Sequence, residues 1–252
     1  MTIKLIKLIA VCRSLAIRTL LAAAFFFAVA SSAQAQILWY NGDDDHISGL
    51  VGTDSTVTEG ADGIVYDDFN IASNTTWDIS GVYGTFLYST VAKGGDDAIT
   101  PTANWEIRTG VSDGNPGTLV ASGVAPLTVT QIGTDRGYTL NTASISGLDV
   151  TLGTGTYWLG IQPVATAGYG YLVTTSGTNS IGSPGGNDSN AFYTSTSFGY
   201  YFFPTGPPPV QGNDFSMGVT GIAVTPEPST WLLLVIGGIV LVSFRLRKYA
   251  VR

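Results

Sequence analysis

Cysteine and histidine, which carry much of the chemistry of enzymes, are almost missing from this chain. Its 252 residues include one cysteine, Cys12, and one histidine, His46. Cys12 lies near the N-terminus, in a stretch with the features of a leader, so the rest of the chain has no cysteine for disulfide or thiol chemistry. A single histidine excludes a zinc or copper site built from several imidazoles. We interpret His46 as a surface loop residue.

Basic residues are scarce in the middle of the chain. Of 11 lysines and arginines, only Lys93, Arg108 and Arg136 lie between residues 36 and 224. The same segment holds 17 of the 18 acidic residues, so its formal net charge is −14, against −7 for the whole chain. This charge repels nucleic acid phosphates and attracts cations. We therefore expect no nucleic acid partner.

The first 35 residues have the three parts of an export signal. An apolar stretch, residues 20–30, precedes the small-x-small pattern formed by Ala33 and Ala35 around Gln34. Four basic residues come before that stretch: Lys4, Lys7, Arg13 and Arg18. This arrangement predicts a signal peptide over residues 1–35 that is cleaved after Ala35. The alternative is an N-terminal helix that is not cleaved.

The last 28 residues, 225–252, combine a proline-rich turn, an apolar run and a basic end. The turn is Pro226-Glu227-Pro228-Ser229-Thr230, in which the prolines fix φ and Ser229 or Thr230 can cap a following helix. Residues 231–244 are apolar, and the basic residues that follow them include Arg245, Arg247 and Lys248. A run of 14 residues is short against the roughly 20 that span a bilayer, but Trp231 and snorkelling arginines extend it. We predict a transmembrane helix over 231–244 with its basic end in the cytoplasm.

In order and spacing, this tail resembles the PEP-CTERM sorting signal of Gram-negative bacteria. Such tails are also labelled ice-binding protein C-terminal domains, a label that describes only the tail. The resemblance implies an exosortase and the export machinery as partners, and a precursor held transiently in the inner membrane. It also implies that the tail is removed and that the protein goes to the cell surface or the exopolysaccharide matrix. The alternative is an ordinary C-terminal membrane anchor.

Between the two ends, residues 36–224 read as one all-β domain. No helical periodicity persists for more than a turn, and Trp105 and Ile107 alternate with Glu106 and Arg108 as in a half-buried strand. Turn-rich segments separate short β-rich runs at the intervals typical of a sandwich. We predict strands over 37–40, 64–71, 76–83, 85–91, 104–109, 118–121, 127–132, 144–152, 156–161, 169–174, 191–194, 200–203 and 215–224.

A second resemblance runs from about residue 64 to residue 161. It rests on Asp67-Asp68-Phe69, Trp77-Asp78-Ile79 and two longer stretches, 115–123 and 155–161. Together they are similar to a jelly-roll-like module of bacterial surface proteins that carry interchangeable C-terminal anchors. The resemblance implies a jelly-roll-like β-sandwich ectodomain over 36–224, and no activity comes with it.

Acidic pairs give the chain one candidate metal site. Asp43, Asp45, Asp67 and Asp68 belong to clusters whose carboxylates are the kind of ligand that calcium takes six to eight of. No EF-hand is present, since His46 stands where that loop needs glycine. Two interpretations stay open, namely solvated acidic turns and a structural calcium ion. We expect no other cofactor.

Aromatic residues gather late in the chain, and Tyr200 and Tyr201 are candidates for stacking on sugar rings. The same residues could equally fill the core of a sandwich. A hydrolase would need a pair of carboxylates, and Glu59 and Glu106 are the only glutamates in the body. Because Glu106 alternates with core positions, we interpret it as an exposed strand residue. We therefore expect a non-enzymatic surface or matrix protein, with a carbohydrate-active hydrolase as the alternative.

Overall fold

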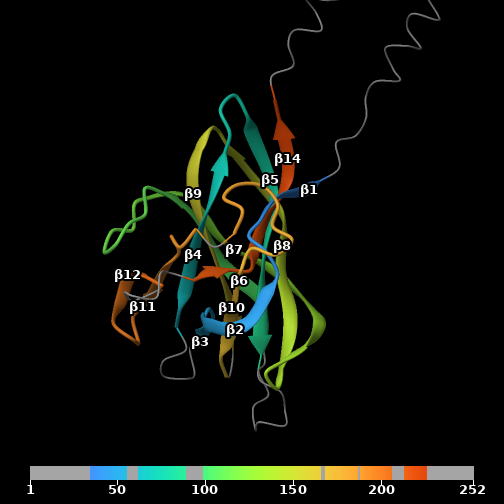
Figure 1. Cartoon of the computed structure of the whole chain (residues 1–252), viewed down its shortest axis with the longest axis vertical. Helices are drawn as coiled ribbons and strands as arrows, with labels where there is room; N and C mark the ends of the chain where they lie inside the picture. The colour runs from blue at the N-terminus through green and yellow to red at the C-terminus, as the bar shows by residue number, and fades with distance from the viewer. Residues whose placement is uncertain are drawn as a thin grey trace, which may run out of the picture. The chain divides into compact units, whose positions relative to one another are not determined.

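The structure, a computed structural model, describes residues 35–55, 62–88, 99–165, 168–186, 188–205 and 213–225 (Figure 1). Residues 1–34 of the predicted signal peptide and residues 226–252 of the predicted sorting signal lie outside these ranges. Among the described residues, no helix is long and apolar enough to cross a membrane.

The described residues form strands and turns, which confirms the predicted all-β class. The strands, in chain order, are β1 (Gln36–Tyr40), β2 (Asp44–Val51), β3 (Asp54–Ser55), β4 (Ile64–Ile71), β5 (Thr76–Tyr88), β6 (Ile99–Thr109), β7 (Thr118–Asp135), β8 (Tyr138–Leu152), β9 (Gly155–Ala165), β10 (Gly170–Thr175), β11 (Phe192–Ser195), β12 (Tyr200–Pro204), β13 (Asp214–Phe215) and β14 (Met217–Val224).

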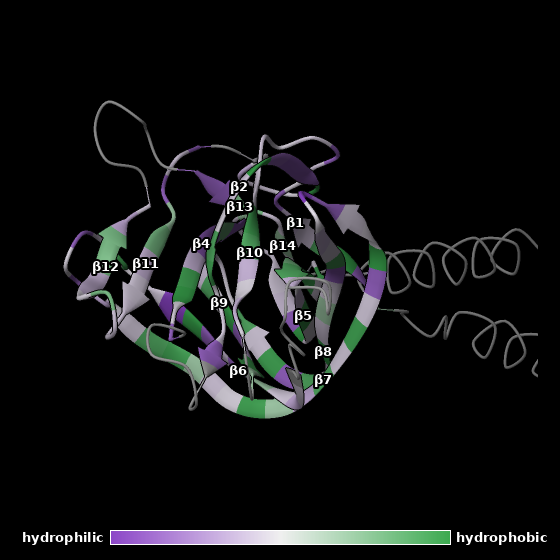
Figure 2. Cartoon of the chain, turned by 90° about the horizontal axis from the view of Figure 1, so that it is seen from below, coloured by the Kyte–Doolittle hydropathy of each residue, from purple (hydrophilic) through white to green (hydrophobic). Residues whose placement is uncertain are grey.

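One long strand, β7, joins the two halves of a curled, largely antiparallel sheet. Its first half pairs with β6 and its second half, from Leu127 onward, pairs with β8. The main path of neighbouring strands is β1-β14-β5-β8-β7-β6-β9-β4-β11-β12, and β3 pairs with β9 in parallel. Figure 2 shows the path curling from β12 through β6 and β7 to β5. The curl brings the inner faces of both halves to one core.

The main core is one large cluster of buried side chains from both halves of the sheet, and a second, smaller cluster contains Tyr66, Val111 and Phe202. Phe86 and Ile145 enter the main core from β5 and β8, and Ile107 and Ile161 enter it from β6 and β9. All four are at least 98% buried. Burying each such side chain contributes about 1.5–3 kcal/mol, which makes this cluster the main source of stability.

The alternation read from the sequence in β6 is confirmed. Trp105 and Ile107 are buried, whereas Glu106 and Arg108 are half-buried on the opposite face. Glu106 is therefore not the freely exposed strand residue that we expected. The reason is a group of side chains on that face, described below.

Two pairs of predicted strands are single strands in the structure. Residues 76–83 and 85–88 lie within β5, residues 89–91 lie outside the described ranges, and residues 118–121 and 127–132 lie within β7. Gly84 and Gly123 lie in the gaps between the predicted strands, and both lie under large side chains. A Cβ on Gly84 would stand 2.9 Å from Leu172 Cδ1, and one on Gly123 would stand 3.1 Å from Trp105 Nε1. These glycines make room for packing rather than for turns.

The sequence did not predict β2, because its first residues are polar. β2 pairs with β10 from Val51 opposite Tyr171 to Asp44 opposite Thr175, with one irregularity in the register. His46 therefore lies in a strand rather than in a loop, although it is exposed as expected. Its φ of 62° lies in the left-handed region, next to hydrogen bonds that fold the chain locally onto the Asp44 and Asp45 carboxylates.

Candidate functional site

Asp43 and Asp45, two of the four calcium candidates, hold the start of β2 against residues near β10. Asp43 accepts hydrogen bonds from the Tyr40 hydroxyl at 2.7 Å and from Asn179 Nδ2 at 2.6 Å. Asp45 Oδ1 accepts one from the Thr174 hydroxyl at 2.7 Å. These hydrogen bonds give both carboxylates a structural role, which is to hold the start of β2 in place.

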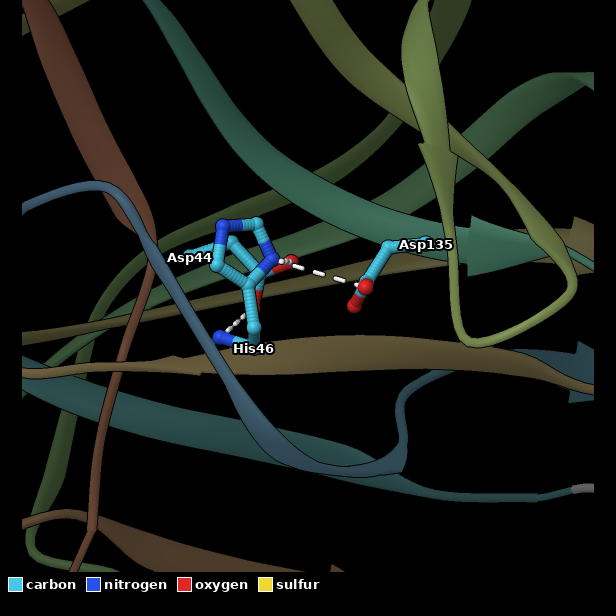
Figure 3. Close-up of side chains that lie close together, drawn as sticks. All are labelled: Asp44, His46 and Asp135. Carbon is cyan, nitrogen blue, oxygen red and sulfur yellow. Dashed lines mark hydrogen bonds and ion pairs between the residues drawn. The ribbon is translucent and has the colours of Figure 1, made fainter.

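Asp44, His46 and Asp135 form a cluster at the surface (Figure 3). One potential ligand atom from each lies within 4.8 Å of the other two, a spacing that suits a metal ion. Arg136 already occupies the acidic side of this cluster, with Nε 2.6 Å from Asp135 and Nη2 3.3 Å from Asp44. Burial raises the pKa of the Asp44 carboxyl, and the charge of Arg136 opposes that rise. The cluster therefore carries its own counter-charge.

The turn between β7 and β8 explains why Arg136 lies there. Asp135 pairs with Tyr138, so Arg136 and Gly137 form a two-residue hairpin loop. Their φ values, 52° and 81°, fit the type I′ turn that such hairpins favour. The turn places Asp135 and Arg136 against β2.

Asp67 and Asp68 lie at a place where the ladder between β4 and β11 has ended. β4 pairs with β9 as far as Ile71, but with β11 only from Ile64 to Tyr66. Beyond Tyr66 the segment that precedes β11 runs along β4, and Asn70 N donates to Ser183 O at 2.7 Å. Polar side chains from both segments meet there.

Asp67 is completely buried and accepts hydrogen bonds from three N–H groups. Asn41 Nδ2 and Phe215 N donate to Oδ2 at 2.8 and 2.7 Å, and Asp68 N donates to Oδ1 at 2.9 Å. Burial, followed by the negative charge of Asp214, raises the pKa of Asp67 well above its usual range. A carboxylate in this position therefore needs either a proton or a neighbouring cation.

Three further aspartates belong to the same region, and we call Asp67, Asp68, Asp188 and Asp214 the inner acidic group. Asp68 is 2% exposed; burial and the charge of Asp188 raise its pKa to about 7, although a hydrogen bond from Asn190 opposes the rise. Burial and Asp188 also raise the pKa of Asp214. The group is thus a set of carboxylates that destabilise one another's ionised forms.

No basic side chain among the described residues pairs with the inner acidic group. Arg108 pairs with Glu106, Arg136 pairs with Asp44 and Asp135, and Lys93 lies outside the described ranges. Three buried oxygens of the group and its neighbours have no hydrogen-bond partner: Asn41 Oδ1, Asp68 Oδ1 and Asn190 Oδ1.

The structure exposes the predicted carbohydrate-binding rings. Tyr200 is 43% exposed and Tyr201 is 59% exposed, and both lie on β12, at the end of the strand order. Phe203 and Phe198, which belong to the same late concentration of aromatic residues, are 42% and 50% exposed in the same segment. We call these four residues the aromatic edge. Tyr200 and Phe203 contact each other with ring centroids 5.3 Å apart, so the edge offers joined ring surfaces.

Glu106, weighed above as a hydrolase carboxylate, is committed to an ion pair. Arg108 Nε lies 2.6 Å from its Oε2, and the Tyr66 hydroxyl donates to the same oxygen at 2.9 Å. The Arg108 guanidinium also lies over the Tyr66 and Phe202 rings, 5.7 and 5.3 Å from their centroids. This packing keeps Glu106 half-buried. Glu59 lies outside the described residues.

The sequence was interpreted as having no Gly-x-Ser-x-Gly pattern of a hydrolase nucleophile elbow, but residues 110–114 match this pattern. An elbow joins a strand to a helix. Here the pattern lies in the turn between the antiparallel strands β6 and β7, where Ser112 and Asn115 exchange backbone hydrogen bonds of 3.1 and 2.8 Å. The surroundings of Ser112 are therefore those of a β-turn.

Comparisons with protein families, with curated proteins and with solved structures gave no match.

Proposed function

We propose that this chain is the precursor of an exported, non-enzymatic protein of the cell surface or the exopolysaccharide matrix. The observation that carries the proposal is the order of residues 225–252: the Pro-Glu-Pro-Ser-Thr turn, the apolar run and the basic end. On this proposal residues 1–35 direct export, residues 36–224 form a jelly-roll-like sandwich ectodomain, and an exosortase acts on the tail. The strongly acidic, cysteine-free body suits an extracellular protein that must stay soluble.

The ectodomain's contribution, on the same proposal, is weak binding of polysaccharide through the aromatic edge. Ring faces stack on the apolar faces of sugars, and the exposure of Tyr200 and Tyr201 meets the first requirement for such contacts. Exposed apolar rings on a soluble protein often mark an interaction site. Many copies in one matrix would gain avidity from individually weak contacts.

A carbohydrate-active hydrolase is the alternative, and one observation favours it. The raised pKa of Asp68, about 7, is of the kind that a general acid needs. Against it, Asp68 is 2% exposed, which leaves a sugar no access to its carboxyl group. We therefore keep the binding role as the main proposal.

The test is retention of residues 36–224 on the exopolysaccharide of the native host, together with an assay for reducing sugar. The core residues all lie between Leu38 and Val219, so this fragment contains the whole core. We expect weak retention that drops in the variants Tyr200→Ala and Tyr201→Ala. The matched control is Ile47→Ala, which removes a side chain 78% exposed on β2 and should leave retention unchanged.

Two results would overturn the proposal. One is equal retention of the wild type and both tyrosine variants. The other is sustained release of reducing sugar by the wild type that stops when Asp68 is changed to asparagine.

A further inference from the structure

We propose that the inner acidic group, together with Asn41 and Asn190, binds a calcium ion that locks the segment before β11 onto β4. This inference does not depend on the proposed function, because it concerns a metal inside the fold rather than the aromatic edge or the sorting tail.

Buried oxygens at the inner acidic group lack hydrogen-bond partners. Asn41 is completely buried, and its amide nitrogen donates to Asp67, so the Oδ1 of the same amide stands beside the acidic group without a hydrogen bond. Asp68 Oδ1 is buried without a partner as well. Leaving such buried acceptors unpaired is unfavourable, so native proteins rarely do so without a reason. A cation is the partner that acceptor oxygens can share.

The negative charge of the inner acidic group is not balanced by any basic side chain of the described residues. Four carboxylates approach one another here. The Asp44 cluster makes the contrast, since Arg136 and His46 both lie within ion-pair distance of its carboxylates. A divalent ion would neutralise the charge of the inner acidic group, as Arg136 neutralises the charge of Asp44 and Asp135. The cluster of Asp44, His46 and Asp135 has the tighter spacing, but Arg136 already balances its charge, so the inner acidic group has the greater need of a metal ion.

The chemistry of the donors points to calcium. Every side chain of the proposed site is an aspartate or an asparagine, and hard oxygen donors select calcium or magnesium over zinc and copper. Within the described ranges, only Asp44, His46 and Asp135 bring three side-chain ligands of the His, Cys, Asp and Glu type within 4.8 Å. The inner site must therefore draw on asparagine and main-chain oxygens as well as carboxylates. Calcium accepts such mixed, irregular shells, whereas magnesium requires a compact octahedron.

The frame around the proposed site is held in place from several sides. Ser189 N donates to both carboxylate oxygens of Asp214, at 3.1 and 3.3 Å. Gly186, with φ of 63°, lies so close to Asn41 that a Cβ there would stand 2.6 Å from the Asn41 carbonyl oxygen. The four contributing segments are therefore largely positioned before the ion binds, and the ion strengthens their attachment by adding a contact that they share.

The test is calorimetric titration of the chelator-treated full chain in detergent, and of residues 36–224 in parallel, with calcium chloride. We expect one ion bound, and a melting temperature higher by about 5–10 °C when calcium is about 100-fold above Kd. Magnesium at the same concentration should give a smaller rise. The variant Asp68→Asn should raise Kd at least tenfold, while its melting temperature in chelator equals or exceeds that of the wild type because one buried charge is gone.

Asp188→Asn is the second variant, because this residue is exposed and we expect its replacement to leave the fold intact. Asp135→Asn is the matched control, because it removes a carboxylate from the cluster that Arg136 already neutralises. The proposal stands if calcium binding weakens in Asp68→Asn or Asp188→Asn and persists in Asp135→Asn. It fails if the wild type binds no calcium, or if both inner variants bind it as the wild type does.

Discussion

Asn41 Nδ2 donates to Asp67 Oδ2 over 2.8 Å, inside a region from which water is excluded. The same oxygen accepts from Phe215 N at 2.7 Å, so one carboxylate joins the end of β1, the middle of β4 and β13. These three segments are far apart in the sequence. Asp67 therefore stabilises the fold by joining these segments, whether or not the neighbouring aspartates bind a metal ion.

Removing the Asp67 carboxylate should cost much of the protein's stability. In Asp67→Ala, Asn41 and Phe215 N lose their acceptor in a buried place, and we expect the free energy of unfolding to fall by about 2–5 kcal/mol. Asp67→Asn keeps one acceptor oxygen and should lose less than half as much. Urea denaturation in chelator measures both, with Asp149→Ala, an exposed position on β8, as the control. Equal losses in the two Asp67 variants would contradict the role given to its oxygen.

The contacts of Arg108 predict that lysine cannot replace it. Its planar guanidinium pairs with Glu106 and lies over the Tyr66 and Phe202 rings, whose centroids are 4.9 Å apart. We expect Arg108→Lys to lose about 1–2 kcal/mol of unfolding free energy, because a lysine cannot make both contacts. Arg136→Lys, at the hairpin turn, should lose less, since Arg136 forms ion pairs with Asp44 and Asp135 that a lysine can keep in part. A loss in Arg108→Lys no larger than in Arg136→Lys would argue against the stacking.

The hydrogen bonds of Asp62 should make the stability of the turn beside the aromatic edge depend on pH in the acid range. Burial alone would raise the pKa of Asp62, but hydrogen bonds from Ser197 and Thr196 outweigh burial and lower the pKa from 3.8 to about 2. Because the folded pKa is below the unfolded one, the ionised carboxylate stabilises the fold above about pH 4, and this contribution is lost as the pH falls towards 2. Asp62 holds the turn between β11 and β12, so the loss should be felt there.

The measurement is the melting temperature of the wild type and of Asp62→Asn from pH 6 to pH 2. We expect the wild type to be the more stable at pH 6 and the difference to shrink between pH 4 and pH 2. A difference that stays constant over this range would show that the hydrogen bonds do not depend on the charge of Asp62.

Processing at both ends is the fourth prediction. The small-x-small pattern at Ala33 and Ala35 and the Pro-Glu-Pro turn predict a mature chain that begins at Gln36 and lacks the apolar run, residues 231–244. Mass spectrometry of the protein taken from the surface of a host that has an exosortase reads both ends. Peptides from residues 231–244 in that mature protein would contradict removal of the tail, and the same host without its exosortase is the control.

Local pattern was enough to predict most of the strands. β4 was predicted at its observed bounds, 64–71, and the burial of Trp105 and Ile107 followed from alternation alone. Strand periodicity is a property of neighbouring residues, so a short window of sequence contains it. The gaps predicted within β5 and β7 contain Gly84 and Gly123, and a glycine in a strand can mark either an irregularity or a position of tight packing.

Only some residues of the candidate sites could be predicted from the sequence. Asp67 and Asp68 could be selected because they are adjacent, and Tyr200 and Tyr201 because aromatic residues concentrate there. Asp188, Asp214, Asn41 and Asn190 could not be joined to them, since nothing local links these positions. A small polar residue in a Gly-Ser-Asn segment looks the same whether it faces water or a buried carboxylate. The signal that could have suggested the group is the imbalance of 17 acids against three bases in the body.

The sequence by itself determined the β class, the charge of the body and the apolar and basic composition of the two ends. Composition and period-two alternation do not depend on where distant segments of the chain meet. Only the tertiary structure decided which acids share a counter-charge. The hairpin turn at Arg136 brings a guanidinium to Asp44 and Asp135, while the end of the β4–β11 ladder at Tyr66 gathers other aspartates with no base among the described residues. Strand pairing between remote segments sets these distances, and Coulomb interactions depend on the distances rather than on the order of residues in the chain.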